Sequence, residues 1–278
     1  MGTAAKRPAL YPEAPRTDGF RDAYDQGAGD APCYSFAPAA DALAKPKMMK
    51  SLPVNFTLSE FRKVTPLDEN NIWVFLLERN SDRIGVKRRD TALENLKKIF
   101  VATFTLANSV GFRAMSLRDL CRETGLSMGG LYGYIENKDQ LAAMIEDAVR
   151  HISETLPSWF EHIAAPLDRI ECILRAQIYM AEILQPWLYF VFLESRGLPP
   201  VHREMAKASE LGSQSNIATL IEQTGTLAPG EASLLAAHCM ALFEDWYVKR
   251  WKYRASNISA DAFARSVMVL LRARIVPT

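Results

Sequence analysis

Hydroxyl and glycine residues that suit phosphate binding lie close together near the middle of the chain. Ser127 is a good helix N-cap, and Gly129 follows it in what the spacing predicts to be the first turn of a short helix. The free backbone N–H groups and the dipole at a helix start favour an anion such as a phosphate. Ser127 serves equally well as a cap alone, so both roles stay open.

The segment that surrounds these residues is basic. Residues 83–141 hold ten basic and six acidic residues, a net charge of +4, whereas the whole chain of 278 residues has a formal net charge of +1. A uniformly basic coat is therefore excluded, but a local basic patch is expected. The run Lys87, Arg88 and Arg89 is its densest part, and we expect it to contact phosphates or a DNA minor groove.

Catalytic and metal-binding constellations are not expected. The sequence has no P-loop, no dinucleotide fingerprint and no H-E-x-x-H motif. The histidines have no evident catalytic partners, and the cysteines lie too far apart for a zinc site or a disulfide framework; they are His151, His162, His202 and His238, and Cys33, Cys121, Cys172 and Cys239. We therefore expect neither enzymatic activity nor a cofactor.

Helices must position the basic and hydroxyl residues. Apolar spacing and caps predict helices over about 91–109, 117–124, 128–134 and 138–155. Gly111 and Gly125 suit the left-handed position after a helix, and Ser116 with Asp119 resembles a capping box. The order of helix, glycine turn, short helix, turn and short helix predicts a helix-turn-helix, whose second short helix enters a DNA major groove.

The same residues resemble a known family. The stretch from Gly111-Phe112 through Ser116-Leu-Arg-Asp-Leu-Cys-Arg-Glu-Thr-Gly125-Leu-Ser127-Met-Gly129-Gly-Leu131-Tyr132-Gly-Tyr134-Ile to Lys138-Asp-Gln-Leu141 looks like the amino-terminal domain of TetR (tetracycline-repressor-like) transcriptional regulators. The resemblance implies an all-α homodimer. Its amino-terminal domain would bind a palindromic operator in double-stranded DNA, and its carboxy-terminal domain would dimerise and bind a small hydrophobic ligand.

The resemblance also implies roles for single residues. Tyr132 and Lys138 match family positions that contact phosphates. Met128, Gly130 and Gly133 depart from the family pattern, which often has larger or more polar residues there, so base reading is expected to fall on Met128, on Arg118 and on backbone exposed by the glycines. The candidate DNA-binding residues are Lys87, Arg88, Arg89, Ser116, Arg118, Ser127, Met128, Gly129, Gly130, Tyr132, Gly133 and Lys138.

The carboxy-terminal part, residues 142–278, is predicted to be wholly helical, with helices near 166–185, 187–196, 200–224, 229–254 and 259–275. The last two would dimerise by resemblance, although their apolar stripes serve equally well as core. Five residues are candidates for lining a ligand pocket: Tyr179, Trp187, Phe190, His238 and Phe243. Short segments at 192–200 and 245–251 are weakly similar to a branch of the family tied to acyl-CoA thioesters, so such a thioester is one candidate effector.

Residues 1–82 precede the family resemblance. Residues 1–50 are rich in proline and glycine and are expected to form a largely disordered tail. The alternative is a strap whose aromatic residues dock on the folded part of the protein. Residues 51–82 are expected to form short helices near 59–64 and 67–79, the latter capped by Thr65, and to pack near the first helix of residues 83–141.

No segment is long and apolar enough to span a membrane, and a cytoplasmic protein is expected. The alternative function is a related dimer that acts through protein contacts without specific DNA reading.

Overall fold

The computed structural model describes residues 49–194 and 200–276, and all regular elements in these ranges are helical, with no strand. The extension and the helix-turn-helix region contain η1 Met49–Ser51, α3 Leu58–Arg62, α4 Ile72–Arg79, α5 Arg89–Val110, α6 Leu117–Thr124 and α7 Met128–Tyr132. The remainder contains α8 Lys138–Thr155, η2 Leu156–Phe160, α9 Pro166–Ile183, α10 Gln185–Glu194, α11 Pro200–Glu222, α12 Pro229–Val248, α13 Arg250–Ala255 and α14 Ala260–Ile275. The expected all-α class is confirmed.

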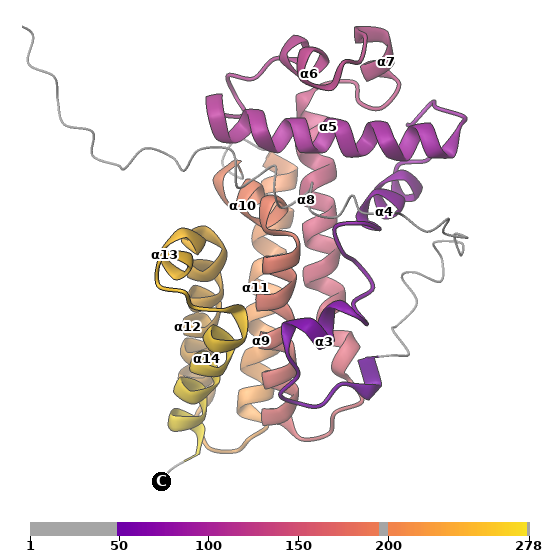
Figure 1. Cartoon of the computed structure of the whole chain (residues 1–278). Coiled ribbons are helices and arrows are strands. Elements are labelled where there is room, and N and C mark those ends of the chain that lie inside the picture. Colours follow the sequence, from indigo (N-terminus) through magenta and orange to yellow (C-terminus); the bar gives the residue numbers. More distant parts are fainter. Residues whose placement is uncertain (1–48, 195–199, 277–278) are drawn as a thin grey trace, which may run out of the picture. The chain divides into compact units, whose positions relative to one another are not determined.

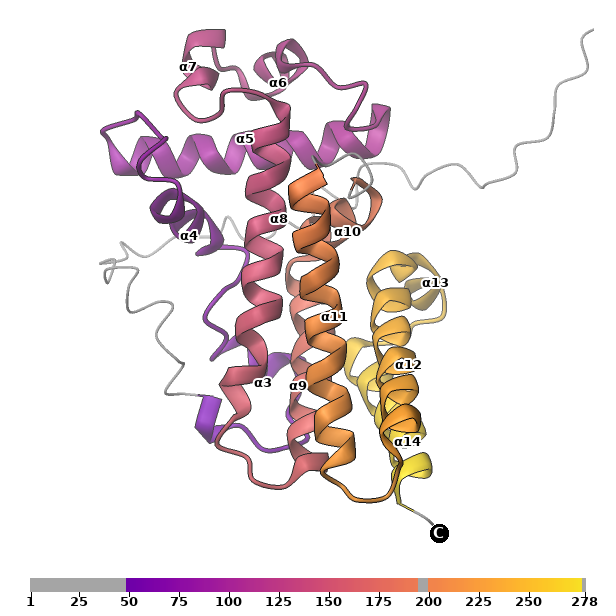
Figure 2. The same cartoon turned by 180° about the vertical axis from the view of Figure 1, so that it is seen from behind.

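Local sequence signals set the ends of the helices around α6. Ser116 and Asp119 form a capping box at the start of α6, and Gly125 ends it in the left-handed conformation with φ of 72°. Gly111 ends α5 with φ of 87°. In both views, α6 and α7 lie on the side of α5 that is remote from α9 and α12 (Figures 1 and 2). The two short helices are therefore presented away from the carboxy-terminal helices.

The carboxy-terminal helices are held by a buried core. Helix α8 extends from the short helices into this core, where it packs against α10 and α11 (Figure 2). Helix α14 packs on α9 and α12, and Trp246 of α12 stacks on Phe263 of α14 at 4.6 Å between ring centroids. Much of the apolar stripe predicted on α12 and α14 is thus core, because Cys239, Trp246 and Val267 are at most 3% exposed.

Residues 51–82 pack on the rest of the protein. Phe56 and Phe61 are fully buried against Phe160 of η2 and Tyr179 of α9. Further along, Trp73 lies 6.3 Å from Phe100 of α5 between ring centroids. The extension therefore contacts both α5, as expected, and the carboxy-terminal helices.

The second helix of the extension is shorter than expected. It begins at Ile72 rather than near residue 67, and Thr65 does not cap it. Instead, Asp68 accepts hydrogen bonds from the N–H groups of Asn70 and Asn71, and the Asn71 amide donates to the carbonyl of Pro66. Such side-chain bonds to local backbone compete with the first helical turn.

The helix expected over 229–254 is divided at Lys249. Helix α12 ends at Val248, and α13 begins at Arg250, because Lys249 leaves the helical region with φ of −110° and ψ of 34°. Asp245 accepts a hydrogen bond from the Tyr253 hydroxyl and pairs with Lys252, which holds α13 against the end of α12. None of the described helices is long and apolar enough to cross a membrane.

Candidate nucleic-acid interface and ligand cavity

Helix α7 presents a polar amino end and an exposed tyrosine. The Gly130 N–H donates to the Ser127 hydroxyl at 3.1 Å, which caps the helix. Ser127 and Gly129 are exposed, and Tyr132 is 53% exposed at the other end of the helix. Leu131 and Tyr134 are buried and anchor the helix to its neighbours. Backbone N–H groups and one phenol are therefore available to a ligand on the outer face.

Gly133 has a different structural role from the one expected. Its carbonyl oxygen accepts a hydrogen bond of 3.1 Å from the Gly85 N–H, so this acceptor is occupied within the chain. A β-carbon at residue 133 would lie 3.2 Å from the Gly130 oxygen and 3.5 Å from Val86. The missing side chain thus lets residues 85 and 86 lie close to the end of α7, which is a packing reason for glycine at this position.

Basic side chains on the chain segment before α5 and on α6 remain available. Lys87, Arg88 and Arg118 are exposed and form no ion pair with any residue in the described ranges. Arg89 differs, because its guanidinium lies 2.9 Å from the carboxylate of Glu78 in α4. Its charge is partly neutralised by the extension, so the basic run contributes two free cations rather than three.

Lys138 is engaged inside the protein. Its ammonium group donates to the carbonyl oxygens of Phe112, Arg113 and Met115 at 3.1, 2.8 and 2.6 Å. Because an ammonium group has three donors, all of them are used. The structure therefore gives Lys138 the role of fixing the loop before α6, and the direct phosphate contact that the resemblance implies is not available without losing one of these bonds.

The remaining candidates on α6 and α7 have mixed surroundings. Ser116 bonds to Asp119 through both its backbone N–H and its hydroxyl, which accounts for it as a cap. Met128 is half-buried, with its sulfur 3.4 Å from that of Cys121. Gly130 is half-buried, and a β-carbon there would lie 3.3 Å from the Ser127 hydroxyl. Side chains that reach outward from this surface are accordingly few.

A cavity of about 420 Å³ lies between α8, α9, α10, α11 and α12. Its size is within the range of small-molecule sites. Of the five aromatic and histidine residues expected to line a pocket, Phe243 contributes to its wall. The polar residues in its lining include Glu146, Arg150, Gln177, Arg203, Lys207, Glu210, Ser213, Glu244 and Tyr247.

The other four expected lining residues lie elsewhere. Tyr179 is buried, with its hydroxyl 2.6 Å from the Asp261 carboxylate, and its pKa is raised first by burial and then by this bond. Trp187 is buried between Phe100 and Phe104 of α5. His238 is exposed on α12. Tyr179 and Trp187 pack in the core, so an aromatic side chain alone did not predict which residues line the cavity.

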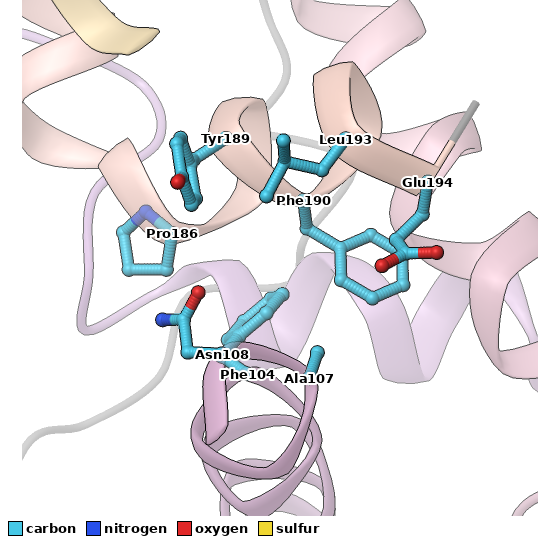
Figure 3. A pocket seen from close by; sticks show the side chains of 8 residues that line it. All are labelled: Phe104, Ala107, Asn108, Pro186, Tyr189, Phe190, Leu193 and Glu194. Atoms are coloured by element: carbon cyan, nitrogen blue, oxygen red, sulfur yellow. The ribbon is translucent and has the colours of Figure 1, made fainter. Parts of the chain in front are cut away.

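Phe190 borders a second, much smaller hollow between α5 and α10 (Figure 3). Its volume is about 10 Å³, which is at the lower limit for a single water molecule. Phe190 also packs edge-on against Phe104 and Phe112. The hollow is a gap between packed helices rather than a site for an organic ligand.

The sequence analysis did not predict the polar residues that line the large cavity. Gln177 looks like an isolated polar residue within the apolar helix α9, and Glu210 and Glu244 look like ordinary surface charges. The one usable signal was a polar residue in a buried helix, since such a group needs a partner.

No group of three or more histidine, cysteine or acidic residues that could hold a metal occurs in the ranges that the structure describes.

Helices α6 and α7 form a helix-turn-helix, and such a motif with basic surroundings is typical of DNA-binding regulators. Residues 99–145 match the sequence model of the family described as bacterial regulatory proteins, tetR family. This segment of the chain is therefore similar to the DNA-binding part of the tetR family, in agreement with the resemblance seen in its sequence.

A solved structure has a similar fold. It is the crystal structure of a bacterial regulatory protein in the tetR family from Rhodococcus RHA1, with a TM-score of 0.56 and 20% sequence identity. The similarity covers 65% of this chain and 96% of that chain. No curated protein matched the chain. The match of residues 99–145 to a family of regulatory proteins indicates a DNA-binding transcriptional regulator.

Proposed function

We propose that this protein binds a palindromic DNA operator as a homodimer, represses transcription and releases the operator when a small molecule occupies the large cavity. The observation that carries the proposal is the set of exposed polar groups on α7, on α6 and on the residues before α5. It combines a capped helix start at Ser127, an exposed Tyr132 and the free cations Lys87, Arg88 and Arg118 on one domain. Such groups hold phosphates and fix the register of a helix in the major groove.

Dimerisation is supported by exposed apolar residues on the outer helices. Leu234 of α12 is 59% exposed, and Val269 and Leu270 of α14 are 66% and 60% exposed. Helices α12 and α14 lie side by side, so a second copy could cover both helices at once (Figures 1 and 2). Covering them with the same helices of a second copy would form an obligate interface of about 2,000 Å² or more.

Ligand control is supported by the position of the cavity. Its wall includes Leu188 and Val191 of α10, and the neighbouring Trp187 of the same helix stacks on Phe100 of α5 at 5.2 Å. Helix α8, which also lines the cavity, begins in the DNA-binding domain. A ligand that moves α10 or α8 in each protomer would therefore shift the DNA-binding domains of the dimer. We expect a coupling free energy between ligand binding and DNA binding of about 1–3 kcal/mol.

A regulator that acts through protein contacts without specific DNA reading is the second candidate. It is favoured by the two glycines, Gly129 and Gly130, within the five residues of α7, because they offer no side chains to base edges. Such a protein would bind DNA through phosphates alone, with little preference between sequences.

Footprinting on the DNA upstream of the protein's own gene separates the two candidates. Operator binding predicts a protected palindrome whose half-site centres are about 34–36 Å apart. Gel filtration of Leu270→Glu tests the dimer in parallel, with the exposed Leu211 of α11, replaced by Glu, as control. A protected site without two-fold symmetry, or a Leu270→Glu variant that remains dimeric, would contradict the proposal.

A further inference from the structure

The basic residues of the large cavity are already paired with carboxylates. Arg150 lies 3.2 Å from the buried Glu146, and it also contacts two other acidic residues of α8. Lys207 lies 2.9 Å from Glu204, and Arg203 lies 3.9 Å from the same carboxylate. The positive charges in the wall are therefore largely compensated before any ligand enters.

Two acidic residues of the wall are not compensated in this way. Glu210 of α11 and Glu244 of α12 both line the cavity, and neither forms an ion pair with a described residue. Burial raises the pKa of Glu244, the charge of Glu210 raises it further, and the more weakly acting Lys249 opposes this. Glu210 is exposed and Glu244 is partly buried, so two like charges share one wall of the cavity, and a cation between them relieves the repulsion.

A third acceptor in the same wall has no partner. Gln177 of α9 is 7% exposed, and its side-chain oxygen is buried without a hydrogen bond from any described residue. A buried amide oxygen without a donor costs free energy, so native structures rarely leave one. A ligand that carries N–H donors would satisfy this requirement together with that of the carboxylates.

The rest of the wall is apolar and aromatic. Tyr247 packs edge-on against Phe243 and Phe192 at 5.2 and 6.2 Å between ring centroids, and all three residues line the cavity. Aromatic faces attract cations and also accommodate apolar groups. Aliphatic residues form much of the remaining lining, among them Val149, Ile152, Leu156, Met180, Leu188 and Val191.

We propose that the cavity binds an amphiphilic organic cation, an amine with an aryl or alkyl body whose ammonium group lies between Glu210 and Glu244. The inference rests on the proposed ligand control and names its ligand class. It also disfavours an acyl-CoA thioester, because the phosphates of such a ligand would meet uncompensated carboxylates. The cation is recognised by charge and N–H donors, and its apolar body by the aliphatic wall.

Calorimetry with a matched series of compounds tests the ligand class. The probes are 4-phenylbutylamine, 4-phenyl-1-butanol and 4-phenylbutyrate, which share one skeleton but differ in charge, together with octanoyl-CoA. We expect the amine to bind about tenfold or more tightly than the alcohol, since a charge-assisted hydrogen bond exceeds a neutral one. The butyrate and the thioester should bind more weakly still. Equal affinity for amine and alcohol, or tighter binding of the thioester, would overturn the proposal.

Charge-removing variants locate the site. Glu210→Gln and Glu244→Gln should each weaken amine binding about tenfold and change alcohol binding less than about twofold. Glu222→Gln is the matched control, because Glu222 is exposed on the same helix as Glu210 but lies outside the cavity wall. Melting temperatures without ligand check folding. Unchanged amine binding in both cavity variants, or equal weakening in the control, would contradict the placement.

Operator binding is measured separately, so that the two proposals fail independently. An amine that binds in the cavity but does not release operator DNA supports the ligand class and contradicts ligand control. A protein that binds no operator contradicts the proposed function and leaves the calorimetric comparison intact. If no probe of the series binds, the ligand class itself is wrong.

Discussion

The ammonium group of Lys138 lies 2.6 Å from the carbonyl oxygen of Met115, 23 residues earlier in the chain. This bond and two others to Phe112 and Arg113 join the first turn of α8 to the loop between α5 and α6. The loop sets the direction in which α6 leaves α5. Lys138 is therefore a residue that positions the helix-turn-helix.

Replacing Lys138 with methionine should mainly lower stability. The methionine keeps apolar contact with the Phe112 ring but leaves three carbonyl oxygens without their donor. We expect a loss of about 2 kcal/mol in the free energy of unfolding, measured by urea denaturation. The salt dependence of DNA binding should keep its slope. A slope lowered by about one with unchanged stability would instead indicate a direct phosphate contact.

Removing either free cation before α5 should weaken DNA binding without sequence preference. Lys87→Ala and Arg88→Ala should each lower affinity for specific and nonspecific duplexes alike, and should reduce the salt slope by about one. The test is binding measured by fluorescence anisotropy at several salt concentrations. Arg254→Ala, which removes an exposed cation of α13, is the control. An effect confined to one base position would contradict a phosphate contact.

Two glycines near α7 should respond oppositely to alanine. At Gly129, a β-carbon meets nothing within 4 Å, so alanine should stabilise the helix by up to about 1 kcal/mol. At Gly125, φ is 72°, and alanine should cost about 1 kcal/mol because L-residues disfavour this region. Thermal unfolding without DNA measures both. Shifts of the same sign would show that the turn is not set by these backbone requirements.

The extension should contribute to global stability. Phe61→Ala empties a fully buried site between Phe56, Trp159 and Tyr179, and should lower the free energy of unfolding by about 3–5 kcal/mol. Lys63→Ala, an exposed change just beyond the same helix, is the control and should have little effect. Chemical denaturation followed by tryptophan fluorescence measures both. A small effect of Phe61→Ala would mean that the extension is only loosely attached.

Elements whose causes are local could be predicted from the sequence alone. The capping box of Ser116 and Asp119, the cap at Ser127 and the turn at Gly125 involve residues at most four apart, so they were predictable. The core positions Leu131 and Tyr134 followed from helical spacing and are buried as expected. Together with the family pattern, these features sufficed to predict the all-α class and the helix-turn-helix.

Which side chains remain available for binding depends on contacts between distant parts of the chain. Lys138 is engaged by carbonyls from another element, Arg89 by Glu78, and the Gly133 carbonyl by Gly85, all through contacts distant in sequence. The cavity arises where five helices fail to fill space, so its lining depends on packing rather than on residue type. For this reason the expected residues Tyr179 and Trp187 became core, whereas Gln177, Glu210 and Glu244 came to line the cavity.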